Sequence, residues 1–304
     1  MPKKVLVALA GATLGWSMAA VGVRYAFESG VSTFTVVGVR LGVAAIAASA
    51  YAMVRRQRIT VEEWRRGAAI GMFRTALSPI LFIGSLQYIS AGVESILITL
   101  IPVGTALLAW VVLGERQRAV QIGGFVMALT GAIVIVASGE SGLGSGEGDP
   151  LIGGLLALGG VAAAAISGVL QRRFAPHHTT TALAVPMFVT GGAISLLVAF
   201  AVSDFDTSTL DAPLWALLLA LGLGSTLLPF GATLYAAKYT TAARVSLVAY
   251  VAPLISIGAG IVLLDEVLTL PIVIGGGLAL TGVVLAGSSA SMRSRSDPAT
   301  VDVA

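Results

Sequence analysis

The sequence predicts an all-α integral membrane protein with ten transmembrane helices, arranged as two inverted repeats of five. Three observations lead to this fold class. First, only 11% of the 304 residues are charged and 57% are hydrophobic, too apolar a composition for a soluble domain of this size. Second, the positive charges fall on alternate connections between apolar stretches. Third, the two halves of the chain match each other at a constant offset.

Ten stretches are apolar enough to cross a bilayer, which takes roughly 20 residues of helix. Their expected bounds are 5–27, 31–54, 67–87, 92–113, 119–137, 151–170, 180–202, 213–236, 243–263 and 271–288. The connections between them are short and leave no room for a soluble domain. The polar residues 289–304 are expected to form a disordered cytoplasmic tail.

The distribution of charge predicts the orientation in the membrane. Fifteen of the 18 Lys and Arg residues fall on connections of one side, and nine acidic residues lie on the other. Because Lys and Arg favour the cytoplasmic side, we expect both termini to lie in the cytoplasm. The protein itself is expected to be a multi-pass protein of the plasma or inner membrane. The positive charge is spread beside lipid and does not gather in a groove, which argues against a nucleic-acid partner.

The second half of the chain repeats the first at an offset of 151 residues. This offset places Trp64 on Trp215, Tyr88 on Tyr239, Pro102 on Pro253 and Glu115 on Glu266. One period holds five spans, so the second copy enters the membrane from the opposite side. We expect repeats at 1–137 and 151–288, joined by an outer linker at 138–150. An inverted repeat is typical of transporters, whose substrate site lies between the halves near the bilayer midplane.

The stretch 86–131 resembles the EamA-type module of the drug/metabolite transporter superfamily. It has a small-residue turn, a proline within the fourth span, Gly114–Glu115 at the end of that span, and a glycine-rich fifth span. The copy at 237–282 keeps the proline and the glutamate but has Asp265 in place of the glycine. The resemblance covers essentially the whole chain.

This resemblance implies ten helices around a central cavity lined by spans 1, 3, 4, 6, 8 and 9. It also implies a secondary transporter that moves a small metabolite by alternating access, as an exporter of amino acids or related polar and amphipathic compounds. A carrier of drugs, sugars or nucleotide-type metabolites and a passive facilitator remain alternatives. The expected partners are the small-molecule substrate and the lipid bilayer.

Polar and aromatic side chains on the implied cavity spans are the candidate substrate-binding residues. Ser95 and Thr99 share a helix face with Pro102, and their repeat mates share the matching face. The alternative for each Ser and Thr is a bond to the preceding turn or a helix contact. An aromatic wall would suit an amphipathic solute. The full candidate set is Trp16, Arg74, Ser78, Ser95, Thr99, Ser167, Thr226, Phe230 and Tyr250.

Three arginines lie inside expected spans, where a charge is costly. Arg24 lies near a span end and can pair with Glu28 at i+4. Arg40 is interpreted as a structural tether that caps carbonyls or reaches Glu94, because span 2 is not among the implied cavity spans. Arg74 lies on a cavity span with no acidic residue at its depth. It is therefore the candidate for binding an anionic group of the substrate, such as a carboxylate, or for gating the inner mouth.

Two repeat-related pairs are candidate hinges or gates. Pro102 and Pro253 each remove a backbone hydrogen bond at mid-depth, although a static kink is the alternative. Glu115 and Glu266 lie at opposite faces and could exchange partners as the gates move. Their alternative role is a charge beside the N-terminal dipole of spans 5 and 10. Neither these two nor Glu94 lies plainly at mid-depth, so the sequence gives no support for proton coupling.

The residues argue against an enzyme. Cysteine is absent, and the two histidines, His177 and His178, fall in an expected inner loop, so no metal or cofactor site is predicted. A phosphate-binding loop is missing too. An intramembrane protease would need a histidine or paired aspartates in the spans, and these are not present. A channel is the remaining alternative, which the inverted repeat disfavours. A homodimer is compatible with the sequence, but no feature indicates one.

Overall fold

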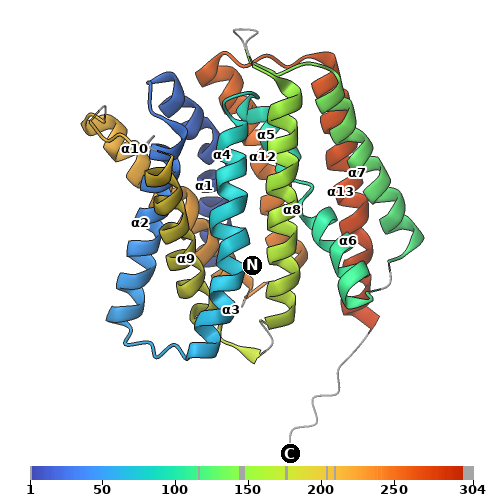
Figure 1. Cartoon of the computed structure of the whole chain (residues 1–304). Helices are drawn as coiled ribbons and strands as arrows, with labels where there is room; N and C mark the ends of the chain where they lie inside the picture. Colours follow the sequence, from blue (N-terminus) through green and yellow to red (C-terminus); the bar gives the residue numbers. More distant parts are fainter. Residues whose placement is uncertain are drawn as a thin grey trace, which may run out of the picture.

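The chain is all-helical in the part that the structure, a computed structural model, describes (Figure 1). The described residues are 2–115, 117–143, 148–174, 177–202, 205–208, 210–237, 239–240 and 242–296. Within these ranges, the side chains of 180, 234, 237, 242–247, 249, 250 and 288–296 are not described.

Each half of the chain supplies a similar series of helices. The first half forms α1 (Lys3–Glu28), α2 (Thr33–Val54), α3 (Val61–Gly71), the π-helical η1 (Met72–Leu77), α4 (Ser78–Ser85), α5 (Ala91–Ile98), α6 (Ile101–Leu113) and α7 (Ala119–Ala137). The second half forms α8 (Pro150–Phe174), α9 (Thr180–Ala201), α10 (Ala212–Gly222), the π-helical η3 (Leu223–Leu227), α11 (Leu228–Ala237), α12 (Ala242–Leu264) and α13 (Leu270–Ser296).

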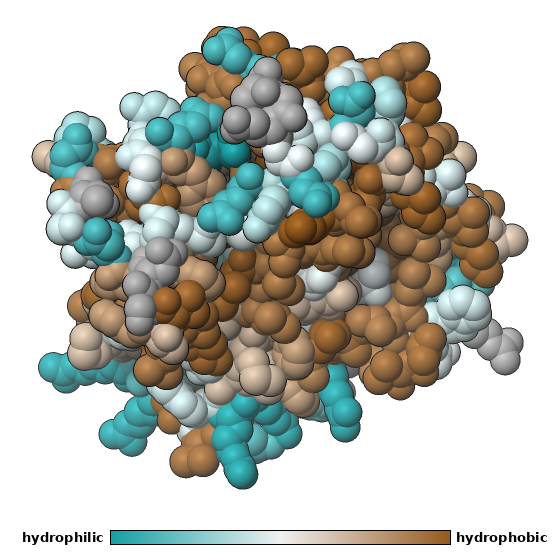
Figure 2. All heavy atoms as spheres, turned by 45° about the horizontal axis from the view of Figure 1, so that its top comes forward, coloured by the Kyte–Doolittle hydropathy of each residue, from teal (hydrophilic) through white to brown (hydrophobic). Residues whose placement is uncertain are grey.

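These helices agree with the predicted membrane architecture. Among the described residues, nine stretches are long and apolar enough to cross a membrane, and Val251–Leu264 of α12 is a shorter apolar helix. Figure 2 shows a broad apolar band, with hydrophilic residues gathered above and below it. Large side chains such as Ile46, Val111 and Val262 are exposed on the apolar surface, as expected where a helix faces lipid. The protein is therefore a multi-pass membrane protein.

Capping residues set the ends of several helices. Ser32, Ser90 and Asp211 accept hydrogen bonds from the first-turn amides of α2, α5 and α10. Thr60 and Glu63 form a capping box that starts α3 at Val61, six residues before the predicted span, because this first turn is charged and reads as a loop by hydropathy.

The tail prediction differs from the structure over eight residues. The helix α13 continues to Ser296, whereas 289–304 were expected to be disordered, and 297–304 lie outside the described residues. The reason is local: no helix-breaking residue follows Leu285 until Pro298 apart from Gly287, and proline disfavours helix in the residue before it.

The helices pack in pairs that the repeat relates to one another. α7 lies against α13, and α2 lies against α9. α1 packs on α11 and α12 of the second half, while α8 packs on α4 and α6 of the first. Each half thus supplies one helix that crosses into the other half. The space enclosed between these crossed helices is the place where a central cavity can form.

Glycine allows the α7–α13 pair to approach closely. A Cβ on Gly131 would lie 3.0 Å from Ala279 Cα and even closer to the Gly275 carbonyl. We expect Gly131→Val to lower the free energy of unfolding by about 1–3 kcal/mol, because two backbones must separate. Gly123→Val is the matched control on the same helix, since a Cβ there meets nothing within 4 Å. Thermal unfolding in detergent measures both, and equal melting temperatures would contradict the prediction.

Candidate substrate cavity

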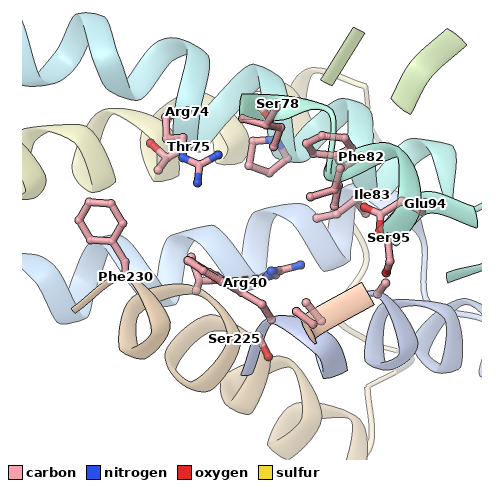
Figure 3. Close-up of a pocket in the computed structure, with 18 of the residues that line it drawn as sticks. Arg40, Arg74, Thr75, Ser78, Phe82, Ile83, Glu94, Ser95, Ser225 and Phe230 are labelled. Carbon is pink, nitrogen blue, oxygen red and sulfur yellow. Dashed lines mark hydrogen bonds between the residues drawn. The ribbon is translucent and has the colours of Figure 1, made fainter. Parts of the chain in front are cut away.

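A cavity of about 370 Å³ lies between the two halves (Figure 3). Its wall is formed by residues of α1, α2, η1, α4, α5, α6, α9, η3, α11 and α12. Spans 1, 3, 4, 8 and 9 therefore contribute as the resemblance implied. Two differences are clear: α2 and α9 also line the cavity, and α8, the expected span 6, does not.

Seven of the nine candidate binding residues line this cavity. They are Trp16, Arg74, Ser78, Ser95, Thr99, Thr226 and Phe230. Ser167 does not line it, because this fully buried side chain donates to the Ala164 carbonyl within α8 at 2.7 Å. Tyr250 belongs to α12, but its side chain lies outside the described residues. The candidate hinges Pro102 and Pro253 are also part of the wall.

Aromatic rings give the cavity much of its apolar surface. Phe230 of α11 meets Phe188 of α9 edge to face, with ring centroids 5.4 Å apart. Trp16 and Phe82 add apolar surface from α1 and α4. These rings come from both halves of the chain, so a solute in the cavity would touch both.

The two π-helical segments occupy equivalent positions in the repeats and both line the cavity. η1 and η3 each begin at the 151-residue offset, at Met72 and Leu223. Thr75 in η1 donates to the Met187 carbonyl at 2.6 Å, and its repeat mate Thr226 in η3 donates to the Leu221 carbonyl at 3.0 Å. Sequence reasoning missed these segments. Pro79 and Pro229, just after them, are one residue out of register, but this shift does not reveal a π-helical turn that both halves carry. Such insertions are frequent at functional sites.

Arg40 lies in the cavity wall, where sequence reasoning expected only a tether outside it. Its Nε donates to Thr226 Oγ1 at 3.0 Å, so it links α2 to η3 through a hydroxyl, and the guanidinium also interacts electrostatically with Glu94. The contact of α2 with α10 places it there, since Gly222 leaves room beside the Arg40 carbonyl. Arg40 therefore contributes a positive charge to the cavity.

Arg74 is the second positive charge of the cavity. It lies on η1, half-buried, and Figure 3 shows its guanidinium directed into the space between η1 and α2. Among the described residues, no ion pair or hydrogen bond joins this guanidinium to a partner. A charged group in this position is costly without a partner, so the cavity favours a ligand that supplies an anionic group.

Glu94 supplies the negative charge, and it was not among the candidate residues. It lies on α5, is only 4% exposed and lines the cavity. Its Oε2 is buried and has no hydrogen-bond partner among the described residues. The sequence placed Glu94 near a span end, but the residue is buried, and the first turn of α5 that carries it is hydrogen-bonded to Glu266 of the loop at 265–269.

The gate candidates Glu115 and Glu266 have different partners. Glu266 Oε1 accepts from the Ala91 amide at 2.6 Å, and Oε2 accepts from the Gly92 amide at 3.1 Å. It therefore caps α5, not the tenth span as its alternative role would require. Burial raises the pKa of the Glu266 carboxyl, and the two amide hydrogen bonds act in the opposite direction. Glu115 instead forms an exposed ion pair with Arg172 at 2.8 Å.

Comparison with known proteins decides the family. The model of the EamA-like transporter family matches residues 3–137 and 151–288. The chain belongs to this family. Like other EamA-like proteins, it is a membrane transporter of small molecules, and its family and relatives indicate a transporter, not an enzyme.

The relatives of this EamA-like chain agree with this assignment. An uncharacterized transporter of Archaeoglobus fulgidus is 25% identical over 284 residues, which cover 93% of this chain and 98% of that protein. The uncharacterized transporter YvbV of Bacillus subtilis is 27% identical over 200 residues, covering 66% and 64% of the two chains. A solved crystal structure shares the fold with a TM-score of 0.61 at 20% identity, over 93% of this chain and 96% of that one.

Proposed function

We propose that this EamA-like protein is a secondary transporter that exports amino acids or closely related amphipathic metabolites by alternating access. The observation that carries the proposal is the charge arrangement of the cavity. Among the described residues, the Arg74 guanidinium has no hydrogen-bond or ion-pair partner and Glu94 Oε2 has no hydrogen-bond partner, and both residues belong to the wall. A solute with an anionic and a cationic group would satisfy both.

The rest of the wall supports the same class of solute. The rings of Trp16, Phe82, Phe188 and Phe230 suit an apolar side chain. The volume of about 370 Å³ lies at the lower end of the range for small-molecule sites, so it favours a small metabolite over a bulky drug. Both halves of the chain touch the cavity, as alternating access between inverted repeats requires.

The direction and membrane orientation complete the proposal. We assign the positively charged connections, such as 55–60 at the lower end in Figure 1, to the cytoplasmic side of the plasma or inner membrane, because Lys and Arg favour that side. Both termini are then cytoplasmic. Outward movement follows the habit of the family.

Counterflow in proteoliposomes tests the function. Vesicles loaded with an unlabelled amino acid should accumulate the same labelled compound from outside, and uptake should saturate. A panel of amino acids, sugars and cationic drugs identifies the preferred class. Conductive current that does not saturate would indicate a channel and overturn the proposal, as would counterflow of sugars or drugs without that of any amino acid.

A further inference from the structure

Glu266 connects the two halves and belongs to the connection between α12 and α13, which lies at the upper end of the molecule (Figure 1). Its buried carboxylate accepts hydrogen bonds from the first two amides of α5, those of Ala91 and Gly92. Such first-turn amides have no partner within their own helix. The negative charge also lies favourably at the N-terminal end of the helix dipole. The fit is close, since a Cβ on Gly260 would collide with this carboxylate. The contact fastens the end of α12 to the start of α5.

Glu115 starts from the same backbone geometry as Glu266 but has a different partner. The preceding residues, Gly114 and Asp265, both have left-handed φ angles, of 69° and 51°. The Glu115 amide donates to the carbonyl six residues earlier at 3.4 Å, and the Glu266 amide does the same at 3.2 Å. Only the side-chain contacts differ, because Glu115 reaches the exposed Arg172.

The two halves also differ in the helices that follow the capped amides. In the first half, the chain breaks between Ile98 and Ile101 into α5 and α6, whereas in the second half α12 runs unbroken through Pro253. α5 packs along α12, where Ser95 Oγ donates to Ser256 Oγ at 2.7 Å. The repeats thus adopt two different conformations of one sequence pattern, as expected of a transporter held in one of its two states.

We propose that Glu266 and Glu115 are alternating latches that hold the two states of the transport cycle. The 151-residue offset maps Ala91 and Gly92 onto Ala242 and Ala243, the first residues of α12. In the other state Glu266 releases α5, while Glu115 leaves Arg172 and caps these amides at the lower end. This inference rests on the proposed alternating access, and it assigns the residue that holds each gate closed.

The same offset identifies a contact that reports each state. It maps Ser95 onto Ser246 and Ser256 onto Thr105, so a Ser246–Thr105 contact should replace the Ser95–Ser256 contact. In this structure Thr105 Oγ1 donates to the Ile101 carbonyl within its own helix. Each pair joins the two halves of the chain and can therefore be tested by cross-linking.

Disulfide trapping tests the latch, because the chain has no cysteine of its own. One variant carries Ser95→Cys with Ser256→Cys, and a second carries Thr105→Cys with Ser246→Cys. A protease site inserted between α7 and α8 allows the two halves to separate on a gel unless they are cross-linked. In the otherwise unchanged chain, both pairs should form in membranes, each trapping one state.

Substitutions of Glu266 and Glu115 should shift the ratio of the two cross-link yields in opposite directions. Glu266→Gln should lower the ratio of the first cross-link to the second by about tenfold, the change expected on loss of a hydrogen bond to a charged group. Glu115→Gln should raise that ratio. Glu62→Gln, at an exposed glutamate paired with Arg66 in one helix, should leave it unchanged.

Several outcomes would overturn the latch. They are an unchanged ratio in both variants, a shift of both in one direction, or a second pair that never cross-links. If the Glu266→Gln protein fails to fold, both cross-links disappear in that variant. The test then rests on the exposed Glu115, whose replacement by glutamine must raise the ratio of the first cross-link to the second. The cross-linking assay needs no substrate. If the cross-link ratios shift as expected but counterflow fails, the result counts against the proposed function alone and leaves the latch supported.

Discussion

Replacing Arg74 by methionine is expected to reduce transport of carboxylate-bearing substrates by about 10- to 100-fold while leaving the protein folded. Arg74 has no partner among the described residues, so its guanidinium is available to the substrate in the cavity wall. A hydrogen bond to a charged group contributes about 1.5–3 kcal/mol, which corresponds to that loss in rate at low substrate concentration.

Stability separates this role from a structural one. Arg74 is a half-buried charge without a partner among the described residues, so replacing it with an apolar side chain of similar length should leave the melting temperature unchanged or raise it. Initial rates of counterflow and thermal unfolding in detergent measure the two effects. Arg173→Met, at an exposed arginine of α8, is the control and should change neither. Full transport by the Arg74→Met protein would show that this residue does not bind the substrate.

The membrane architecture was predictable because hydropathy and charge act along the chain. Nine apolar helices within the described residues agree with the predicted spans, since each span is limited by polar connections such as 55–60. Besides the longer α13, the exception is α3, where the capping box of Thr60 and Glu63 extends the helix into charged residues. Local hydrogen bonding, not hydropathy, decides that boundary.

The cavity was predictable only where helical periodicity and the repeat place polar residues on one face. Ser95 and Thr99 were found in this way. Arg40 is not predicted in this way, because span 2 is not among the cavity spans that the resemblance implies. The packing of α2 against the second half brings it into the wall. The burial of Glu94 depends on the loop that carries Glu266, more than 170 residues later in the chain. Contacts of this kind leave no periodic signal.

The two segments η1 and η3 show a further limit. A π-helical turn inserts a residue into the helical period without a signal in the hydropathy, although Arg74 within η1 and Ser78 just after it both line the cavity. The extra residue turns Thr75 toward the Met187 carbonyl and leaves Thr226 free to accept from Arg40. That the two halves share such a segment at the same offset is seen only in the structure.

Replacing Glu94 by glutamine is expected to change the selectivity of the transporter. The buried Glu94 Oε2 has no hydrogen-bond partner among the described residues, although Glu94 interacts electrostatically with Arg40, so we expect it to bind the amino group of the substrate. The variant should transport phenylalanine about 10- to 100-fold less well at low concentration, because a charge-assisted hydrogen bond is lost. Phenylpropionate, which lacks the amino group, should be transported at least as well as by the unchanged protein, because the cavity wall then holds no Glu94 carboxylate to repel this anion.

The Arg74→Met and Glu94→Gln variants together make the assignment specific. Phenethylamine lacks the carboxylate, so its transport should survive Arg74→Met and fail in Glu94→Gln, the reverse of the pattern for phenylpropionate. Competition against labelled phenylalanine in counterflow measures all three compounds, with Glu62→Gln as the isosteric control. A role of Glu94 in packing alone would weaken transport of the three compounds equally. Only direct contact with the substrate produces crossed losses, because each variant removes one charge from the same cavity.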